Sequence, residues 1–212
     1  MPIRVKICGI NSAIAFDTAI AAGADWLGFV FFSGSPRCVS PALAAALSAR
    51  HPVGPIRIGL FVSPSVPEIA AVLATMPLDG LQLYGTVDFP AIRARFNLPL
   101  WRAVGVATRP DLPGTCQDAD ALLIEAKAPP DATRPGGNAL TFDWSVLQNW
   151  AAPCPWLLAG GLTSDNVGEA VRATGAQAVD VSSGVESAPG VKDPARIRAF
   201  IAAARAGASS QA

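Results

Sequence analysis

Residues 155–186 read PWLLAGGLTSDNVGEAVRATGAQAVDVSSGVE, and this stretch decides the predicted fold. Two short apolar runs, residues 156–159 and 178–181, each stop at small residues. Short apolar runs bounded by glycine are typical of buried parallel strands. Ser164 or Asp165 can cap a helix between them. The apolar side chains of that helix are Val167, Ala170, Val171 and Ala173. The stretch therefore predicts a strand–helix–strand unit.

The same alternation of strand and helix extends outward through the whole chain. The segments with the apolar character of buried strands are residues 3–8, 26–32, 56–62, 80–84, 100–106, 121–126, 156–159 and 178–181. Helices are expected at residues 12–22, 41–50, 66–75, 89–96, 143–150, 167–173 and 193–204. Alternating strands and helices predict an α/β protein with a parallel sheet and right-handed crossovers. Eight such units predict closure into a single (β/α)₈ TIM barrel.

Two turns rich in small residues follow the last two predicted strands. They are Gly160-Gly161 and Ser182-Ser183-Gly184. Turns of this kind aim backbone N–H groups at an anion, which is usually a phosphate. In (β/α)₈ barrels the phosphate site is typically formed by the loops after strands 7 and 8. We therefore expect Gly160, Gly161, Ser183 and Gly184 to bind phosphate; the alternative is that these glycines only make tight turns.

Length and composition limit the class of protein. The chain has 212 residues, no net charge, 51% hydrophobic and 15% charged residues, which fits one large domain with a buried core. We expect this domain at residues 1–207 and a frayed tail at residues 208–212. The chain has no run of Lys and Arg, so we expect no nucleic-acid partner. No apolar stretch is long enough to span a membrane, and residues 1–4 lead into a strand rather than a signal peptide.

Cysteine and histidine are used sparingly. Cys8, Cys38, Cys116 and Cys154 form no C-x-x-C pair, so we expect reduced thiols in the cytoplasm, neither disulfide-bonded nor binding zinc. His51 is the only histidine and lies at an expected helix end. The sequence therefore predicts no bound metal and no histidine-based catalysis.

Two candidate catalytic residues lie at the ends of predicted strands, where barrel enzymes carry their active sites. Cys8 ends the first strand and can act as a general base if nearby cations lower its pKa; the alternative is a small buried apolar residue. Glu125 ends the apolar run 121–124 and can act as a general acid if desolvation raises its pKa. The alternative for Glu125 is an ion pair with Lys127 or an arginine.

Other rim residues are candidates for substrate binding. Arg37 follows Pro36 on a loop and can fork a substrate carboxylate, or it can be a solvated loop charge. Gln82 and Asp180 lie at the ends of further strands, and Asp180 can contact a sugar hydroxyl or cap a loop. The long segment 127–141 is either a lid with glycine hinges or a surface excursion.

An acid and a base around a phosphate-anchored substrate suit an aldose–ketose isomerisation. The acid opens the sugar ring, and the base removes a proton from C2. This chemistry needs no redox cofactor, so the sequence predicts an enzyme without a cofactor.

The motifs together resemble the phosphoribosylanthranilate isomerase family of tryptophan biosynthesis. The resemblance extends from about residue 3 to 201. The segments that carry it are Lys6-Ile7-Cys8-Gly9-Ile10, Gly28-Phe29-Val30-Phe31, Ser35-Pro36-Arg37, Gly59-Leu60-Phe61-Val62, Leu81-Gln82-Leu83, Gly136-Gly137, Phe142-Asp143-Trp144, residues 158–162, Asn166-Val167, residues 179–186 and residues 190–193.

The resemblance implies an Amadori rearrangement of N-(5-phosphoribosyl)anthranilate to the carboxyphenylamino-deoxyribulose phosphate. It implies that Cys8 is the general base and that Arg37 holds the anthranilate carboxylate. It also implies that the last two glycine-rich loops hold the phosphate. The family contains monomers and dimers, so either state is expected.

The chain departs from the family pattern at three places. Glu125 stands where the family usually has the acidic Asp, and Tyr84 stands where it usually has His. Asn138-Ala139 replaces the usual Thr-Gly. These departures leave two alternatives open: a diverged phosphosugar isomerase acting on a related amino-sugar phosphate, and a non-catalytic barrel that binds a phosphate ligand.

Overall fold

The computed structural model of the chain describes residues 2–132 and 134–209. Eight parallel strands form a closed barrel in sequential order, and β1 completes the ring by pairing with both β2 and β8. The barrel strands are β1 (Arg4–Cys8), β2 (Trp26–Val30), β3 (Ile56–Val62), β4 (Gly80–Tyr84), β5 (Leu100–Val106), β6 (Ala121–Ala126), β7 (Trp156–Leu158) and β8 (Ala178–Val181). The predicted (β/α)₈ TIM barrel is thus confirmed.

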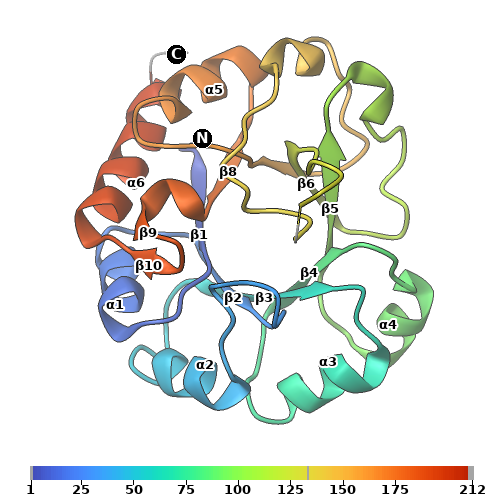
Figure 1. Cartoon of the computed structure of the whole chain (residues 1–212), viewed down its shortest axis with the longest axis vertical. Helices are drawn as coiled ribbons and strands as arrows, with labels where there is room; N and C mark the ends of the chain where they lie inside the picture. The colour runs from blue at the N-terminus through green and yellow to red at the C-terminus, as the bar shows by residue number, and fades with distance from the viewer. Residues whose placement is uncertain (1, 133, 210–212) are drawn as a thin grey trace.

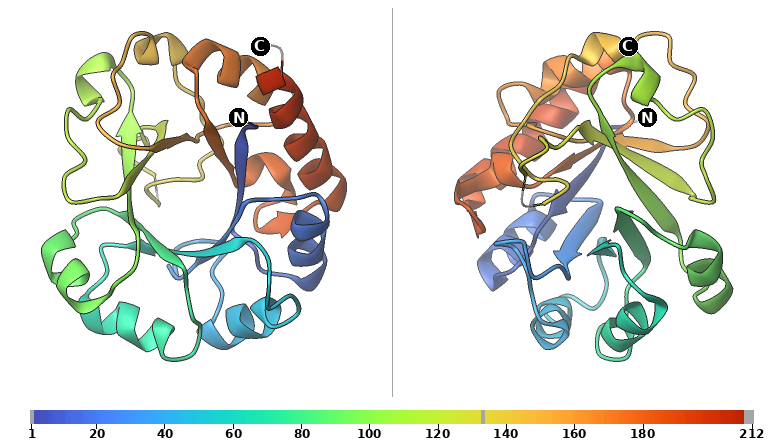
Figure 2. Two further views of the ribbon diagram at one scale, coloured as in Figure 1. Left: turned by 180° about the vertical axis from the view of Figure 1, so that it is seen from behind. Right: turned by 45° about the vertical axis from the view of Figure 1, so that its right-hand side comes forward.

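Helices form a ring around the strands (Figures 1 and 2). The α-helices are α1 (Ala13–Ala21), α2 (Pro41–Ser48), α3 (Val66–Leu73), α4 (Phe89–Arg95), α5 (Val167–Thr174) and α6 (Pro194–Ser209). Short 3₁₀ helices are η1 (Arg109–Asp111), η2 (Trp144–Leu147) and η3 (Ser183–Val185). Apolar side chains on the outside of the barrel pack against the helices to form the main core.

Local sequence explains most helix starts. The hydroxyl of Ser12 accepts a hydrogen bond from the Ala15 N–H, and Ser40 does the same for Leu43, as expected for N-caps. The expected caps of α5 are wrong, because its N-cap is Asn166. Asn166 accepts a hydrogen bond from the Thr163 N–H, which fixes the preceding turn.

The C-terminal part differs from the expectation in two ways. A two-stranded antiparallel hairpin, β9 (Glu186–Ala188) and β10 (Val191–Lys192), follows η3. Helix α6 includes Ala208 and Ser209, which we expected in the frayed tail, and residues 210–212 lie outside the described residues. The hairpin brings two charged side chains, Glu186 and Lys192, back toward the barrel.

Inside the barrel lies a second apolar cluster. We call it the inner cluster, and it consists of Trp26, Ile58, Tyr84, Trp101, Ala121, Leu123, Leu157, Ala159 and Ala178. Trp26 and Trp101 meet edge to face at 5.4 Å. The guanidinium of Arg4 lies 3.9 Å from the centre of the Trp26 ring. Most of this cluster lies toward the N-terminal ends of the strands, where it lines a second cavity, and polar residues further along the same strands face the opposite opening.

A disulfide joins Cys116 and Cys154, so the prediction of four reduced thiols is wrong for this pair. The two cysteines are 38 residues apart, and the barrel brings the β5–β6 and β6–β7 connections together. Sequence spacing gave no sign of this contact because it depends on the closed barrel. Cys8 and Cys38 are free.

We predict that the disulfide stabilises the folded protein. Cys116→Ser should lower the free energy of unfolding by about 2–4 kcal/mol under non-reducing conditions, because the unfolded chain regains the entropy of an open loop. Urea unfolding measures the change, and Cys38→Ser, at an exposed free thiol, is the control. Equal stability of the two variants would contradict the prediction.

Candidate active site

The strand period of two places the candidate residues inside the barrel. Leu123 belongs to the inner cluster, so Glu125, two residues later on β6, also points inward. The same phase applies to Asp180, which follows Ala178 on β8. A cavity opens at this end of the barrel. The predicted residues that line it are Cys8, Arg37, Glu125, Gly160, Gly161, Asp180 and Ser183.

Two predicted residues lie beside this cavity and do not line it. Gln82 is fully buried and lies two residues before Tyr84 on β4. Its Nε2 donates a hydrogen bond of 3.1 Å to the Tyr84 hydroxyl. Gly184 packs against the turn after β7, and a Cβ atom at this position would overlap the carbonyl oxygen of Leu162. The loops after β7 and β8 therefore touch each other at the same end of the barrel, as the phosphate prediction requires.

Cys8 lies beside a buried ion pair. Nζ of Lys6 donates to Oδ1 of Asp180 at 2.8 Å, and the Lys6 side chain has no solvent exposure. Burial lowers the pKa of Lys6, but Asp180 and Cys8 outweigh it and hold this pKa above its ordinary value. Burial raises the pKa of the Cys8 thiol, while the positive charges of Lys6 and Lys192 act against the rise. Burial and Asp180 outweigh the two lysines, so the pKa of Cys8 stays above its ordinary value and is not lowered as the prediction requires, although Lys6 and Lys192 favour the thiolate.

Among residues 2–132 and 134–209, no cation forms a hydrogen bond or ion pair with Glu125. Burial raises the pKa of its carboxyl to about 8, and hydrogen bonds from Tyr84 and from the backbone of Gly137 limit the rise. The negative charge of Asp180 adds to it, and Lys6 opposes it. Desolvation thus acts in the direction that a general acid at Glu125 requires. The alternative ion pair with Lys127 is wrong, because Lys127 Nζ pairs with Asp111 at 3.1 Å.

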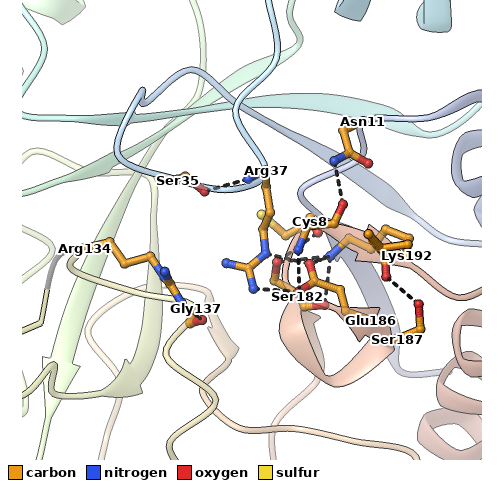
Figure 3. A network of polar contacts seen from close by, with 12 residues as sticks. Cys8, Asn11, Ser35, Arg37, Arg134, Gly137, Ser182, Glu186, Ser187 and Lys192 are labelled. Carbon is orange, nitrogen blue, oxygen red and sulfur yellow. Dashed lines mark hydrogen bonds and ion pairs between the residues drawn. The ribbon is translucent and has the colours of Figure 1, made fainter.

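Arg37 is fixed by a charged network rather than solvated on a loop (Figure 3). Its Nε and Nη2 donate to the two carboxylate oxygens of Glu186 at 2.6 and 2.9 Å. Nζ of Lys192 donates to Oε1 of Glu186 at 2.8 Å and to the carbonyl oxygen of Ser182, also at 2.8 Å. Two cations thus share one carboxylate, which leaves positive charge for an anion in the cavity.

The loop between β6 and β7 covers the opening (Figure 1). Arg134, Pro135, Gly136 and Gly137 all line the cavity, so the alternative of a surface excursion is wrong. A Cβ atom at Gly136 would lie 2.7 Å from Oε1 of Glu125. Only glycine allows the loop to approach the carboxyl this closely. Thr133, within this loop, lies outside the described residues.

Sequence reasoning did not identify Lys6, Glu186 or Lys192 as parts of the site. The sequence did carry a signal for Lys6, a charge inside an otherwise apolar strand. Glu186 and Lys192 reach the site only through the β9–β10 hairpin, which has no counterpart in the strand–helix alternation.

Residues 2–132 and 134–209 contain no group of three or more His, Cys, Asp or Glu placed to hold a metal ion. Within the same ranges, no helix has the length and apolar character needed to cross a membrane.

We predict that Gly184→Ala separates the two glycine-rich loops. The new methyl group would collide with Leu162, and overpacking of this kind costs about 1–3 kcal/mol. Unfolding in urea should show this loss, and inorganic phosphate should bind more weakly. Gly114→Ala is the control, because a Cβ at Gly114 meets no atom within 4 Å. If Gly184→Ala matches the control in both measurements, the two loops do not depend on this contact.

Comparisons with known proteins agree on one family. The model of the N-(5'phosphoribosyl)anthranilate (PRA) isomerase family matches residues 5–203. The N-(5'-phosphoribosyl)anthranilate isomerase of Acidiphilium cryptum (strain JF-5) is 55% identical over 204 residues, which are 96% of this chain and 98% of the relative.

Two solved structures have the same fold and related sequences. One contains monomers of the dimeric phosphoribosylanthranilate isomerase from Thermotoga maritima; it is 33% identical, with a TM-score of 0.80 over 96% of this chain and 99% of that one. The other is a phosphoribosyl anthranilate isomerase in complex with reduced 1-(o-carboxyphenylamino)-1-deoxyribulose 5-phosphate. It is 32% identical, with a TM-score of 0.80 and the same coverage. The chain therefore belongs to the N-(5'-phosphoribosyl)anthranilate isomerase family.

Proposed function

We propose that the protein converts N-(5'-phosphoribosyl)anthranilate to 1-(2-carboxyphenylamino)-1-deoxyribulose 5-phosphate, in tryptophan biosynthesis. One observation carries this proposal: Cys8 and Glu125 face a single buried cavity that Arg37 and the glycine-rich loops also line. Neither alternative, a different amino-sugar phosphate or a barrel without catalysis, has a feature of the site in its favour.

Glu125 acts first, as the general acid. With a pKa near 8, its carboxyl keeps a proton at neutral pH. It gives that proton to the ribose ring oxygen, the C1–O bond breaks, and the anthranilate nitrogen supplies the electron pair for a C1=N iminium. The ring is then open, and the hydrogen on C2 has become acidic.

Cys8 acts second, as the general base. Its thiolate removes the C2 proton, the C–H electrons form a C1=C2 bond, and the C=N electrons return to nitrogen. The resulting enol gives the 2-ketone when C1 gains a proton. Lys6 and Lys192 support this step because their charges favour the thiolate.

The substrate has two anionic ends, a carboxylate and a phosphate. We assign the carboxylate to the cationic edge of the cavity at Arg37 and the phosphate to the edge formed by the glycine-rich loops. Arg37 uses Nε and Nη2 for Glu186, so Nη1 remains for the anthranilate carboxylate. Gly160, Gly161 and Ser183 line the part of the cavity that we assign to the phosphate, with Gly184 supporting their loop. Asp180 holds Lys6, and we assign Gln82 an indirect role through Tyr84.

We further propose that the protein works in the cytoplasm, as a monomer or a homodimer. Phosphorylated metabolites such as this substrate are made and retained in that compartment. The Cys116–Cys154 disulfide is unusual there, because cytoplasmic thiols are normally kept reduced.

The function is tested by steady-state isomerase kinetics on N-(5'-phosphoribosyl)anthranilate. Cys8→Ser and Glu125→Gln should each lose about 10²–10⁴-fold in kcat, because neither replacement can transfer the proton. Glu125→Asp keeps an acid and should lose less than Glu125→Gln. Wild-type activity in Glu125→Gln would place the acid elsewhere, with Asp180 the next carboxyl to examine.

We predict that Arg37 contributes to binding of the carboxylate end. A hydrogen bond to a charged group is worth about 1.5–3 kcal/mol, so Arg37→Ala should lose roughly 10- to 150-fold in kcat/KM. Arg37→Lys preserves a cation beside Glu186 but lacks the planar fork, and should recover only part of the loss. Unchanged kinetics in both variants would remove Arg37 from substrate binding.

A further inference from the structure

Tyr84 is the only tyrosine in the chain, and it ends β4 inside the barrel. It is 7% exposed and lines the cavity. Nε2 of Gln82, on the same face of β4, donates a hydrogen bond to its hydroxyl oxygen at 3.1 Å. An amide nitrogen can only donate, so the phenol accepts from Gln82 and keeps its own hydrogen for another partner.

That partner is Glu125. Gly136 lies against both groups: a Cβ atom there would lie 2.7 Å from Oε1 of Glu125 and 3.0 Å from Cε1 of Tyr84. The Tyr84 hydroxyl also acts to lower the pKa of the Glu125 carboxyl, as a donor to the charged form does. The phenol hydrogen that is not used toward Gln82 is therefore assigned to this carboxyl, under the covering loop.

We propose that Tyr84 is a positioning residue, which holds one oxygen of Glu125 so that the protonated oxygen faces the ribose ring. The inference rests on the proposed function, in which Glu125 is the general acid. Gln82 fixes the direction of the Tyr84 hydroxyl, which explains why a buried amide lies below the cavity instead of lining it. The rotatable bonds of a glutamate side chain let its carboxyl adopt several positions, whereas proton transfer requires one. The contact with Tyr84 restricts these positions.

Other charged groups face the same pair and must be kept constant in any test. They are Lys6 and Cys8 on β1, Asp180 on β8, and Arg37 on the loop after β2. Tyr84→Phe removes only the hydroxyl and leaves all of them in place. This variant therefore isolates the hydrogen bond to Glu125.

The first measurement is carboxyl ¹³C NMR of the full chain labelled at glutamate Cδ. The sequence has four glutamates, Glu68, Glu125, Glu169 and Glu186, and Glu125→Gln identifies the Glu125 signal by its loss. In the wild type this signal should titrate near pH 8. A hydrogen bond from Tyr84 favours the carboxylate, so its removal in Tyr84→Phe should move the titration to higher pH. The other three signals are internal controls.

The second measurement is isomerase kinetics in a double-mutant cycle. Tyr84→Phe should lower kcat by about 10- to 100-fold with little change in KM, because misplacing a catalytic group by about 1 Å costs about 10²-fold. In a Glu125→Gln background the same change should cause no further loss. Leu157→Val, in the inner cluster, is the control for a core perturbation without this hydrogen bond.

The outcomes separate this inference from the proposed function. If Glu125→Gln retains wild-type activity, the assignment of the acid fails, and the role of Tyr84 fails with it. If Glu125→Gln is impaired but Tyr84→Phe changes neither kcat nor the Glu125 titration, only the present inference is overturned. An equal loss from Tyr84→Phe in both backgrounds also overturns it, because Tyr84 would then act independently of Glu125.

Discussion

The site depends on how the barrel accommodates charges that water does not reach. Removing a charged group from water costs several kcal/mol unless a partner compensates it. Lys6 has Asp180 as its partner, and Arg37 and Lys192 share Glu186. The Lys6–Asp180 and Arg37–Glu186 pairs join distant parts of the chain and meet only when the barrel closes, whereas Lys192 reaches Glu186 within the β9–β10 hairpin. The same contacts that make burial tolerable therefore fix the positions of the site residues around the cavity.

Glu125 differs from these paired groups because no ion pair with a described residue compensates its burial. Its hydrogen-bond partners are the neutral Tyr84 hydroxyl and the Gly137 backbone, so burial dominates and its proton is retained at neutral pH. Burial also raises the pKa of Cys8, but two lysines, Lys6 and Lys192, oppose that rise by favouring the thiolate. The cations near Cys8 and the neutral hydrogen-bonding groups near Glu125 are what distinguishes the proposed proton acceptor from the proposed proton donor.

The sequence was sufficient for residues whose position follows from strand ends. Cys8 and Glu125 were predicted at the cavity because the rim of a parallel barrel is set by where each strand stops. Gln82 was predicted on the correct face of β4, but it lies deeper in the barrel than predicted and does not line the cavity. How far along the barrel axis a residue lies depends on the stagger between neighbouring strands. The Cys116–Cys154 bond was not predicted because it joins two separate connections. The Glu186–Lys192 hairpin was not predicted because it lies inside the β8–α6 connection and has no counterpart in the strand–helix alternation.

Tyr84 and Glu125, where the family resemblance led us to expect other residues, both lie against Gly136 although 41 positions separate them in sequence. The strand between them, β5, turns the small side chain of Ala103 toward the inner cluster, which leaves room for a phenol and a carboxyl to meet. Gly136 then closes over both at a distance that no side chain would allow. A longer acid, a phenol that reaches it and a glycine above them are mutually dependent, so a change at any one of them alters the geometry of the other two.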